Sequence, residues 1–253
     1  MIGKGSTGPE VERWQLFLRG LMHNSNVVVS GIFDDITDAE TKKFQSDNNL
    51  TADGIVGPGT LKASYKYEYP EAYSAVIDHQ NPGIKNLSFI ERQKLFGYFS
   101  YIPAPTPDNP EGIRITDGWA VNNIKSVVIP QLVGVQGASR SGVVQAHTKI
   151  ANQIVALFQA WEDAGLKDRI ITWGGLWVPR FIRGSRSSLS NHSWGTAFDI
   201  NAQWNGLGVK PADVGKKGSV KELVSIAVDH GFYWGGWFPN RPDGMHFEAY
   251  KII

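Results

Sequence analysis

Three residues of types that bind transition metals lie in two short stretches of the C-terminal half of the chain. His192 and Asp199 are seven positions apart, and His246 follows near the C-terminus. Two imidazoles and one carboxylate suit zinc, with other divalent metals as alternatives. Catalytic zinc sites keep one coordination position open for water, whereas structural zinc sites are closed by four protein ligands. The triplet therefore predicts one zinc ion per chain in an open site of the catalytic type.

Strand alternation predicts how two of these residues come together. Asp199 lies in the run Thr-Ala-Phe-Asp-Ile and His246 in the run Met-His-Phe-Glu-Ala. Because successive side chains of a strand point to opposite faces, Asp199 points away from the face that carries Phe198 and Ile200. By the same alternation, His246 shares a face with Glu248. If the two strands pair with their apolar faces inward, Asp199 and His246 point into one cleft, with His192 folding back from the preceding turn. The small residues Gly195 and Ala197 would leave room there for a metal and a substrate.

The remaining elements of this half are grouped along the chain rather than regularly alternating. The hydrophobic patterns predict helices over 144–164 and 220–230 and strands over 169–173, 196–200 and 245–250. In this scheme His147 begins the apolar stripe of the long helix. Grouped helices and strands favour an α+β fold over a parallel α/β sheet.

Residues 1–66 are expected to form a small unit of three helices. Pro9 suits the first position of a helix, and Val11, Trp14 and Leu18 recur on one helical face. A capping-box pattern at 37–40 opens a second helix that ends near Asn48-Asn49, and a short third helix begins at Thr60-Leu61. The residues alone thus indicate a three-helix accessory domain, followed by a linker over 67–89 and a second domain over 90–253.

The N-terminal unit resembles the peptidoglycan-binding type 1 module. The matching residues are Gly5, Gly8, Val11, Gln15, Leu18, Gly31, Phe33, Thr37, Phe44-Gln45, Leu50, Asp53-Gly54-Ile55-Val56-Gly57 and Thr60. This resemblance implies that the module binds peptidoglycan.

The second domain resembles VanY-type D,D-carboxypeptidases and L-alanyl-D-glutamate endopeptidases of the M15 group of zinc peptidases. The matching pattern is Ser190-x-His192-x-x-Gly195-x-Ala197-x-Asp199, followed by Asp243-x-x-His246. The resemblance implies zinc bound by His192, Asp199 and His246. It also implies a central antiparallel sheet flanked by helices, as in the related hedgehog domain.

Hydrolysis of an amide also needs a carboxylate that moves a proton from water to the leaving amine. The resemblance places this general base at Asp243, where many relatives carry glutamate. Glu248 is the alternative, because alternation puts it on the His246 face. We favour Asp243, since the turn at Gly244 can swing it inward.

The oxyanion of the reaction needs a positive partner, and the resemblance implies an upstream arginine in this role. Arg180 is the first candidate and Arg183 the second, and a surface or substrate-carboxylate contact is the alternative for either. Alternation in an extended segment would place the two arginines on opposite faces, so we expect only one to reach the cleft. Ser190 is expected to orient a ligand or contact the substrate.

Composition restricts the class of protein. Of 253 residues, 42% are hydrophobic, and 25 basic against 24 acidic residues give a net charge of +1, which argues against a nucleic-acid partner. Cysteine is absent, so any zinc must be held by His, Asp or Glu. The start lacks the apolar run of a signal peptide, and no stretch approaches the roughly 18 apolar residues of a membrane span. We therefore expect a soluble protein with no membrane insertion, and as a separate expectation we take it to be a monomer.

Together, the two resemblances imply a modular enzyme that binds peptidoglycan and cuts a peptide bond in it. The leading hypothesis is a bacteriophage endolysin, acting as an L-alanyl-D-glutamate endopeptidase, that waits in the host cytoplasm before its release to the cell wall. A bacterial enzyme with a non-standard export route is an alternative origin. A D-alanyl-D-alanine carboxypeptidase of wall maturation is an alternative activity. A non-catalytic wall-binding protein with structural zinc is a third hypothesis.

Overall fold

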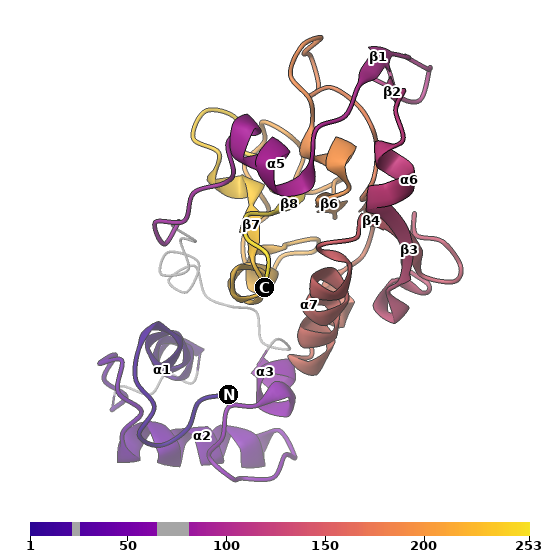
Figure 1. The fold of residues 1–253 in the computed structure, drawn as a ribbon. Helices are drawn as coiled ribbons and strands as arrows, with labels where there is room; N and C mark the ends of the chain where they lie inside the picture. The colour runs from indigo at the N-terminus through magenta and orange to yellow at the C-terminus, as the bar shows by residue number, and fades with distance from the viewer. Residues whose placement is uncertain (22–25, 65–80) are drawn as a thin grey trace. The chain divides into compact units, whose positions relative to one another are not determined.

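The structure is a computed structural model that describes residues 1–21, 26–64 and 81–253 (Figure 1). The chain divides into two compact units, the first holding the described residues up to Ser64 and the second most of the chain from Asn81 onward. Residues 67–80 of the expected linker lie outside the described residues. Among the described residues, no helix is long and apolar enough to cross a bilayer.

The described residues of the first unit up to Ser64 form three helices: α1 (Pro9–Leu21), α2 (Asp35–Asp47) and α3 (Pro58–Ser64). The expected face of α1 is buried, with Val11 and Leu18 fully inside and Trp14 3% exposed. Trp14 stacks on Phe17 at a centroid distance of 4.7 Å, and its indole N–H donates to Thr41 Oγ1 at 2.7 Å. The apolar stripe of α1 therefore forms the centre of a small core.

The start of α2 differs from the expected capping box at 37–40. The N-cap is Asp34, whose Oδ1 accepts from the Thr37 backbone N–H at 2.8 Å and from the Thr37 hydroxyl at 2.6 Å. Thr37 is fully buried inside the first turn. The Asp34 carboxylate, three residues before Thr37, caps a free backbone N–H at the helix start, so the helix begins earlier than predicted. The predicted end is confirmed, because Asn48 is the C-cap.

Two buried glutamines tie the loops of this unit to its helices. Gln15 Oε1 accepts from the backbone N–H groups of Ser30 and Gly31, at 3.0 and 2.9 Å. Gln45 Oε1 accepts from the Gly54 N–H at 2.9 Å, and its Nε2 donates to the Ile55 carbonyl at 2.9 Å. A buried amide side chain that satisfies backbone groups in this way fixes the turn to the helix that carries the glutamine.

A four-stranded antiparallel sheet is the centre of the second unit, in the order β5-β6-β8-β7 (Figure 1). Its strands are β5 (Trp173–Gly175), β6 (Ala197–Ile200), β7 (Phe232–Trp234) and β8 (His246–Ala249). The protein is therefore α+β, with the expected central antiparallel sheet. β7 was not predicted, and of the predicted strand 169–173 only Trp173 belongs to β5.

The two faces of this sheet differ in chemistry. Phe198 of β6 and Phe247 of β8 are register partners and stack at a centroid distance of 5.4 Å. Phe158 of α7 (Ala151–Asp163) packs on Phe198 from the same side, 5.6 Å away. Because successive side chains alternate, the opposite face carries Asp199 and His246. The aromatic core thus holds in place the strands that present the polar residues.

Smaller elements surround the sheet. They are α5 (Phe89–Phe96), β1 (Tyr101–Pro103), β2 (Ile113–Ile115), α6 (Trp119–Asn123), β3 (Ile124–Val128), β4 (Val143–His147) and α8 (Val224–Asp229). A 3₁₀ turn over Lys221–Leu223 precedes α8, so the predicted helix 220–230 is two elements.

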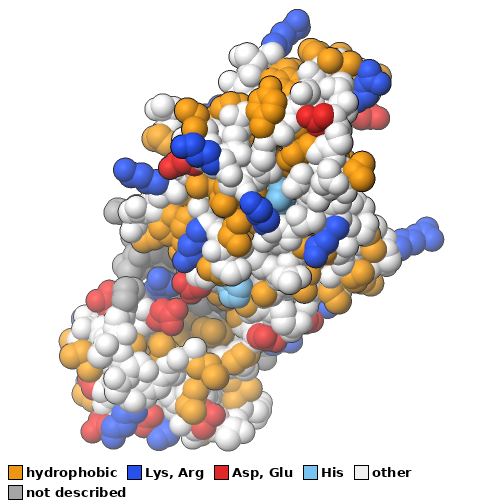
Figure 2. All heavy atoms as spheres, in the orientation of Figure 1, with side chains coloured by type: hydrophobic (Ala, Val, Ile, Leu, Met, Phe, Trp, Pro, Cys, Tyr) orange, Lys and Arg blue, Asp and Glu red, His pale blue; other side chains and the backbone are white. Residues whose placement is uncertain are grey.

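On the face seen in Figure 2, basic and acidic side chains are interspersed with apolar and neutral ones.

The prediction of one helix over 144–164 was wrong in its first part. Residues 143–147 form β4, antiparallel to β3, and the helix begins only at Ala151. Val144 and Ala146 are buried while Gln145 between them is exposed, which is strand periodicity. His147 ends this strand fully buried, with Nε2 3.1 Å from the Phe96 carbonyl and Nδ1 accepting the Lys149 N–H. Burial lowers the pKa of His147.

Candidate metal centre and its cavity

The sheet register brings two of the three predicted ligands together. Asp199 and His246 are directly paired residues of β6 and β8. His192 comes from a 3₁₀ turn, Asn191–Trp194, that ends at Gly195 just before β6. Gly195 has φ of 66°, a conformation that favours glycine. The turn therefore folds back over the polar face of the sheet and delivers His192 to the other two residues.

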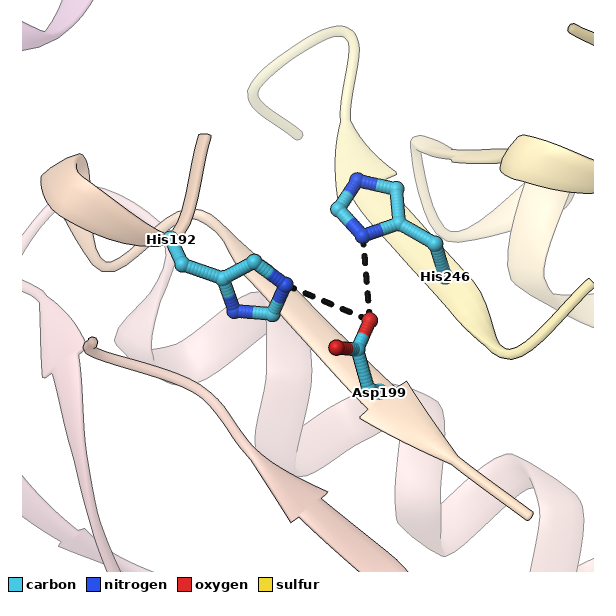
Figure 3. A group of neighbouring side chains, drawn as sticks. All are labelled: His192, Asp199 and His246. Atoms are coloured by element: carbon cyan, nitrogen blue, oxygen red, sulfur yellow. Dashed lines mark hydrogen bonds and ion pairs between the residues drawn. The ribbon is translucent and has the colours of Figure 1, made fainter. Parts of the chain in front are cut away.

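The three side chains converge on one point (Figure 3). Asp199 Oδ1 lies 3.2 Å from His192 Nε2 and 3.0 Å from His246 Nδ1. One donor atom from each residue lies within 4.8 Å of the others, and all three residues are buried. Tetrahedral zinc with bonds of about 2.0–2.1 Å places its ligand atoms roughly 3.3 Å apart. The two observed separations from the carboxylate fit this spacing.

Each histidine uses its other ring nitrogen for a different contact. His192 Nδ1 lies 2.9 Å from the Leu176 carbonyl, and His246 Nε2 lies 3.0 Å from Glu248 Oε2. Outer contacts of this kind orient a metal-binding imidazole and fix its tautomer. His192 Nε2 is buried and makes no hydrogen bond to any part of the chain that the structure describes. A buried nitrogen aimed at a carboxylate without hydrogen-bond geometry fits a metal ligand.

The electrostatics agree with this fit. Burial by itself would raise the pKa of Asp199, but the two histidines outweigh it and hold the pKa well below its usual range. Burial would lower the pKa of His246, but Asp199 and Glu248 outweigh it and raise the pKa from 6.5 to about 10. A positive charge at His246 is thus strongly favoured in this pocket. A divalent cation held by the cluster would supply positive charge beside the same Asp199 carboxylate.

A cavity of about 670 Å³ opens beside the three residues. Its walls include His246 together with all four of the other predicted site residues, Arg180, Arg183, Ser190 and Asp243. Both arginines line it, so the expectation that only one reaches the cleft was wrong. The reason is a hairpin: Phe181 pairs with Leu189, and the chain turns between them at Gly184, so alternation does not continue to Arg183.

The two arginines occupy different environments in this cavity. Arg180 is half-buried, and burial lowers its pKa while the carboxylates of Asp199 and Asp243 raise it. Arg183 is exposed at the rim, where its carbonyl accepts from Arg241 Nη1 at 3.2 Å. Arg180 is therefore the arginine in the electrostatic field of Asp199 and Asp243. Ser190 is buried, and its carbonyl accepts the Ser193 N–H in the turn that carries His192.

Asp243 is a carboxylate with an uncommitted oxygen beside the cluster. Its backbone N–H donates to the Gly235 carbonyl at 2.9 Å, and its own carbonyl accepts from the His246 N–H at 3.1 Å. A side chain at Gly235 would collide with the Asp243 carbonyl, which explains the close approach. Asp243 Oδ1 is buried and makes no hydrogen bond within the described residues. Burial raises the pKa of Asp243, as expected for a group that exchanges protons.

Glu248, the alternative base, is engaged on several sides. Its Oε2 contacts His246 Nε2 and accepts a short hydrogen bond from Asn191 Nδ2, and its Oε1 lies 3.8 Å from Arg92 Nη2. Burial would raise the pKa of Glu248, but His246, Arg92 and Asn191 outweigh it and lower the pKa. A carboxylate held in this way is a poor proton acceptor compared with Asp243.

The sequence did not reveal several residues of this region. Arg92 and Asn191 contact Glu248, and Phe238 and Arg241 line the cavity. Asn191 could have been noticed as the neighbour of His192, whereas Arg92 lies in a distant helix and gives no local signal. Gly195 was misread: a side chain there would collide with Ile124 and the β4 backbone, so the glycine makes room for protein and not for substrate.

A buried cluster of two imidazoles and a carboxylate opens on a cavity lined by a further carboxylate and two arginines, and these are residue types that metal-dependent hydrolytic sites use. Residues 183–249, which include all three cluster residues, match the sequence family described as D-alanyl-D-alanine carboxypeptidase of the M15 peptidases. Residues 7–63 match the family described as putative peptidoglycan binding domain. No curated protein matches the chain. The two matches, in this order, are those of a modular peptidoglycan hydrolase: a wall-binding domain followed by a peptidase domain.

Proposed function

We propose that this protein is a zinc-dependent endopeptidase that cuts a stem-peptide or cross-link amide of peptidoglycan, with the L-alanyl-D-glutamate bond as the preferred target. The observation that carries the proposal is the meeting of His192, Asp199 and His246 at the edge of a cavity that also holds Asp243. A cluster with three protein ligands has a position left for a substrate or water.

The residues of the chain have distinct roles in this proposal. His192, Asp199 and His246 would hold the metal ion. Bound there, a divalent ion would polarise the scissile carbonyl and lower the pKa of a water molecule. Asp243 accepts a proton from the attacking water and delivers it to the leaving amine nitrogen, so that a carboxylate and a free amine are released.

The arginines and the serine would act on the substrate. Arg180 faces the negative charge that develops on the carbonyl oxygen, because it already lies in the field of Asp199 and Asp243. Arg183, at the exposed rim, contacts a more distant part of the substrate. Ser190 lines the cavity from the turn that carries His192, where it orients the substrate.

The N-terminal module supports an insoluble polymer as the substrate. A domain that binds peptidoglycan keeps the peptidase near many identical bonds, and this raises their effective concentration without new active-site contacts. We propose that the protein acts as a monomer, as an endolysin that lyses the host cell from within after release from the cytoplasm. A soluble wall precursor would gain little from such tethering.

D-alanyl-D-alanine carboxypeptidase activity is the second candidate, favoured by the description of the family that residues 183–249 match. The test is digestion of purified peptidoglycan with the zinc-loaded protein, followed by mass spectrometry of the products. New N-terminal D-glutamate supports the endopeptidase. Release of D-alanine alone supports the carboxypeptidase, and no release of either by a protein that binds zinc and peptidoglycan contradicts both enzymatic functions.

A further inference from the structure

Glu248 connects the segments that carry the metal-binding residues. It is the residue two positions after His246 on the same face of β8, and only 2% of it is exposed. Its Oε2 contacts both His246 Nε2 and the side-chain amide of Asn191, the residue before His192. One carboxylate oxygen therefore links β8 to the turn that carries the other histidine.

A second element neutralises this buried charge. Arg92 of α5 is 7% exposed and places Nη2 3.8 Å from Glu248 Oε1. Its own position is fixed by donation to the Leu87 carbonyl at 2.7 Å and by packing of its guanidinium over the Trp194 ring, 5.7 Å from the centroid. Trp194 closes the same turn that contains His192. An ionised carboxylate buried this deeply needs such a partner to stay charged.

We infer that Glu248 is a positioning residue, which acts through His246 and not on the substrate. It accepts the Nε2 proton of His246, so the lone pair of the imidazole is left on Nδ1, the atom 3.0 Å from Asp199. The negative charge on Glu248 also makes this nitrogen a stronger donor to a metal ion. Arg92 and Asn191 keep the carboxylate in place for this purpose. The inference rests on the proposed function, because it assumes that the cluster binds zinc.

The test measures zinc affinity in the full-length protein by competition with a chromophoric chelator, and so does not depend on catalysis. We expect Glu248→Gln to weaken zinc binding about tenfold and Glu248→Ala about 10- to 100-fold. Gln keeps the shape and an acceptor oxygen, so it separates the loss of charge from the loss of packing. Glu222→Gln is the matched control: Glu222 is an equally buried carboxylate, paired with Arg169 and Ser219, and its loss should leave zinc affinity unchanged.

A second measurement separates positioning from proton transfer. At saturating zinc, Glu248→Gln should keep kcat within about tenfold of the wild type, and the visible spectrum of the cobalt-substituted protein should shift. Glu248→Gln with unchanged zinc affinity would overturn the inference. A zinc-saturated Glu248→Gln with its kcat lost would also overturn it, since Glu248 would then act on reacting atoms. A wild-type protein that binds no zinc would overturn the proposed function itself.

Discussion

His246 Nδ1 and Asp199 Oδ1 lie 3.0 Å apart across a directly paired position of two adjacent antiparallel strands. This separation is set by the backbone hydrogen bonds of β6 and β8 and not by a loop. The third residue of the cluster, His192, comes from a turn in which His192, Ser193 and Trp194 are buried. The cluster is therefore preformed by the fold, which favours tight and selective metal binding.

Removal of His192 should abolish both metal binding and lysis. His192→Ala leaves the paired strands intact but removes one of three donors, so we expect stoichiometric zinc to be lost together with wall-lytic activity. Elemental analysis and the clearing of a cell-wall suspension measure the two effects. His230→Ala is a control, since His230 caps α8 through the Ile226 carbonyl. Lysis by His192→Ala at the wild-type rate would exclude the metallopeptidase.

Zinc binding should release a proton. The pKa of His246 in the metal-free site is about 10, so its ring is protonated at pH 7. A metal ion needs the neutral ring, and one proton must therefore leave as it binds. The apparent affinity should weaken roughly tenfold for each unit that the pH falls between about pH 8 and 7. Calorimetry in two buffers of different ionisation enthalpy measures the proton, and heats that do not depend on the buffer would contradict this prediction.

Asp243 should matter for turnover but not for the metal. Asp243→Asn removes the proton acceptor and leaves all three donors, so kcat/KM should fall by about 10²–10⁴-fold while zinc is retained. Because burial raises the pKa of Asp243 and the base must be ionised, activity should fall as the pH falls through that raised pKa. The exposed Asp108→Asn is the control. Wild-type activity in the zinc-loaded Asp243→Asn variant would show that another group is the base.

Arg180 and Arg183 should affect different kinetic constants when a soluble muropeptide is the substrate. Arg180→Ala should lower kcat by about 10²–10³-fold, as loss of an oxyanion donor does. Arg183→Ala, at the exposed rim, should mainly raise KM, by about tenfold. The exposed Arg140→Ala should change neither constant. The opposite pattern, with KM affected at Arg180 and kcat at Arg183, would reverse the assignment.

Gln45 should be structural in the wall-binding module. Gln45→Leu keeps the side-chain volume but leaves the buried Gly54 N–H without its partner, while the Ile55 carbonyl keeps only the Thr60 hydroxyl as a donor. We expect the first unit to lose about 1–3 kcal/mol of unfolding free energy, mainly from the one unsatisfied backbone N–H. Hydrogen exchange of residues 44–60 in the full-length protein reports this loss, with the exposed Lys43→Ala as control. Hydrogen-exchange rates that are the same as in the wild type would contradict this prediction.

Local sequence patterns correctly predicted the elements whose apolar residues repeat with a regular period. The alternation around Asp199 and His246 gave the polar face of the sheet, and the apolar stripe of Val11, Trp14 and Leu18 gave α1. The short strand at 143–147 was missed because its apolar residues also fit the period of the helix that follows. Periodicity alone does not separate the two possibilities in so short a run.

Contacts between distant segments could not be predicted in this way. Arg92 meets Glu248 only because α5 lies over the polar face of the sheet, and no pattern near either residue indicates it. The placement of both arginines on the cavity depends on the hairpin at Gly184, which ends the extended conformation assumed from the sequence. Tertiary geometry, and not residue type, decided these cases.

The opposed faces of β6 and β8 limit how this enzyme can change. Adding or deleting one residue in either strand would exchange its two faces, sending Phe198 or Phe247 outward and burying Asp199 or His246 among aromatic rings. Stability and chemistry would then be lost together, so the positions of Asp199 and His246 on the sheet are tied to its aromatic core. New substrate preferences must instead arise in residues 182–188 and 238–242, where side chains at the cavity can vary without shifting a strand.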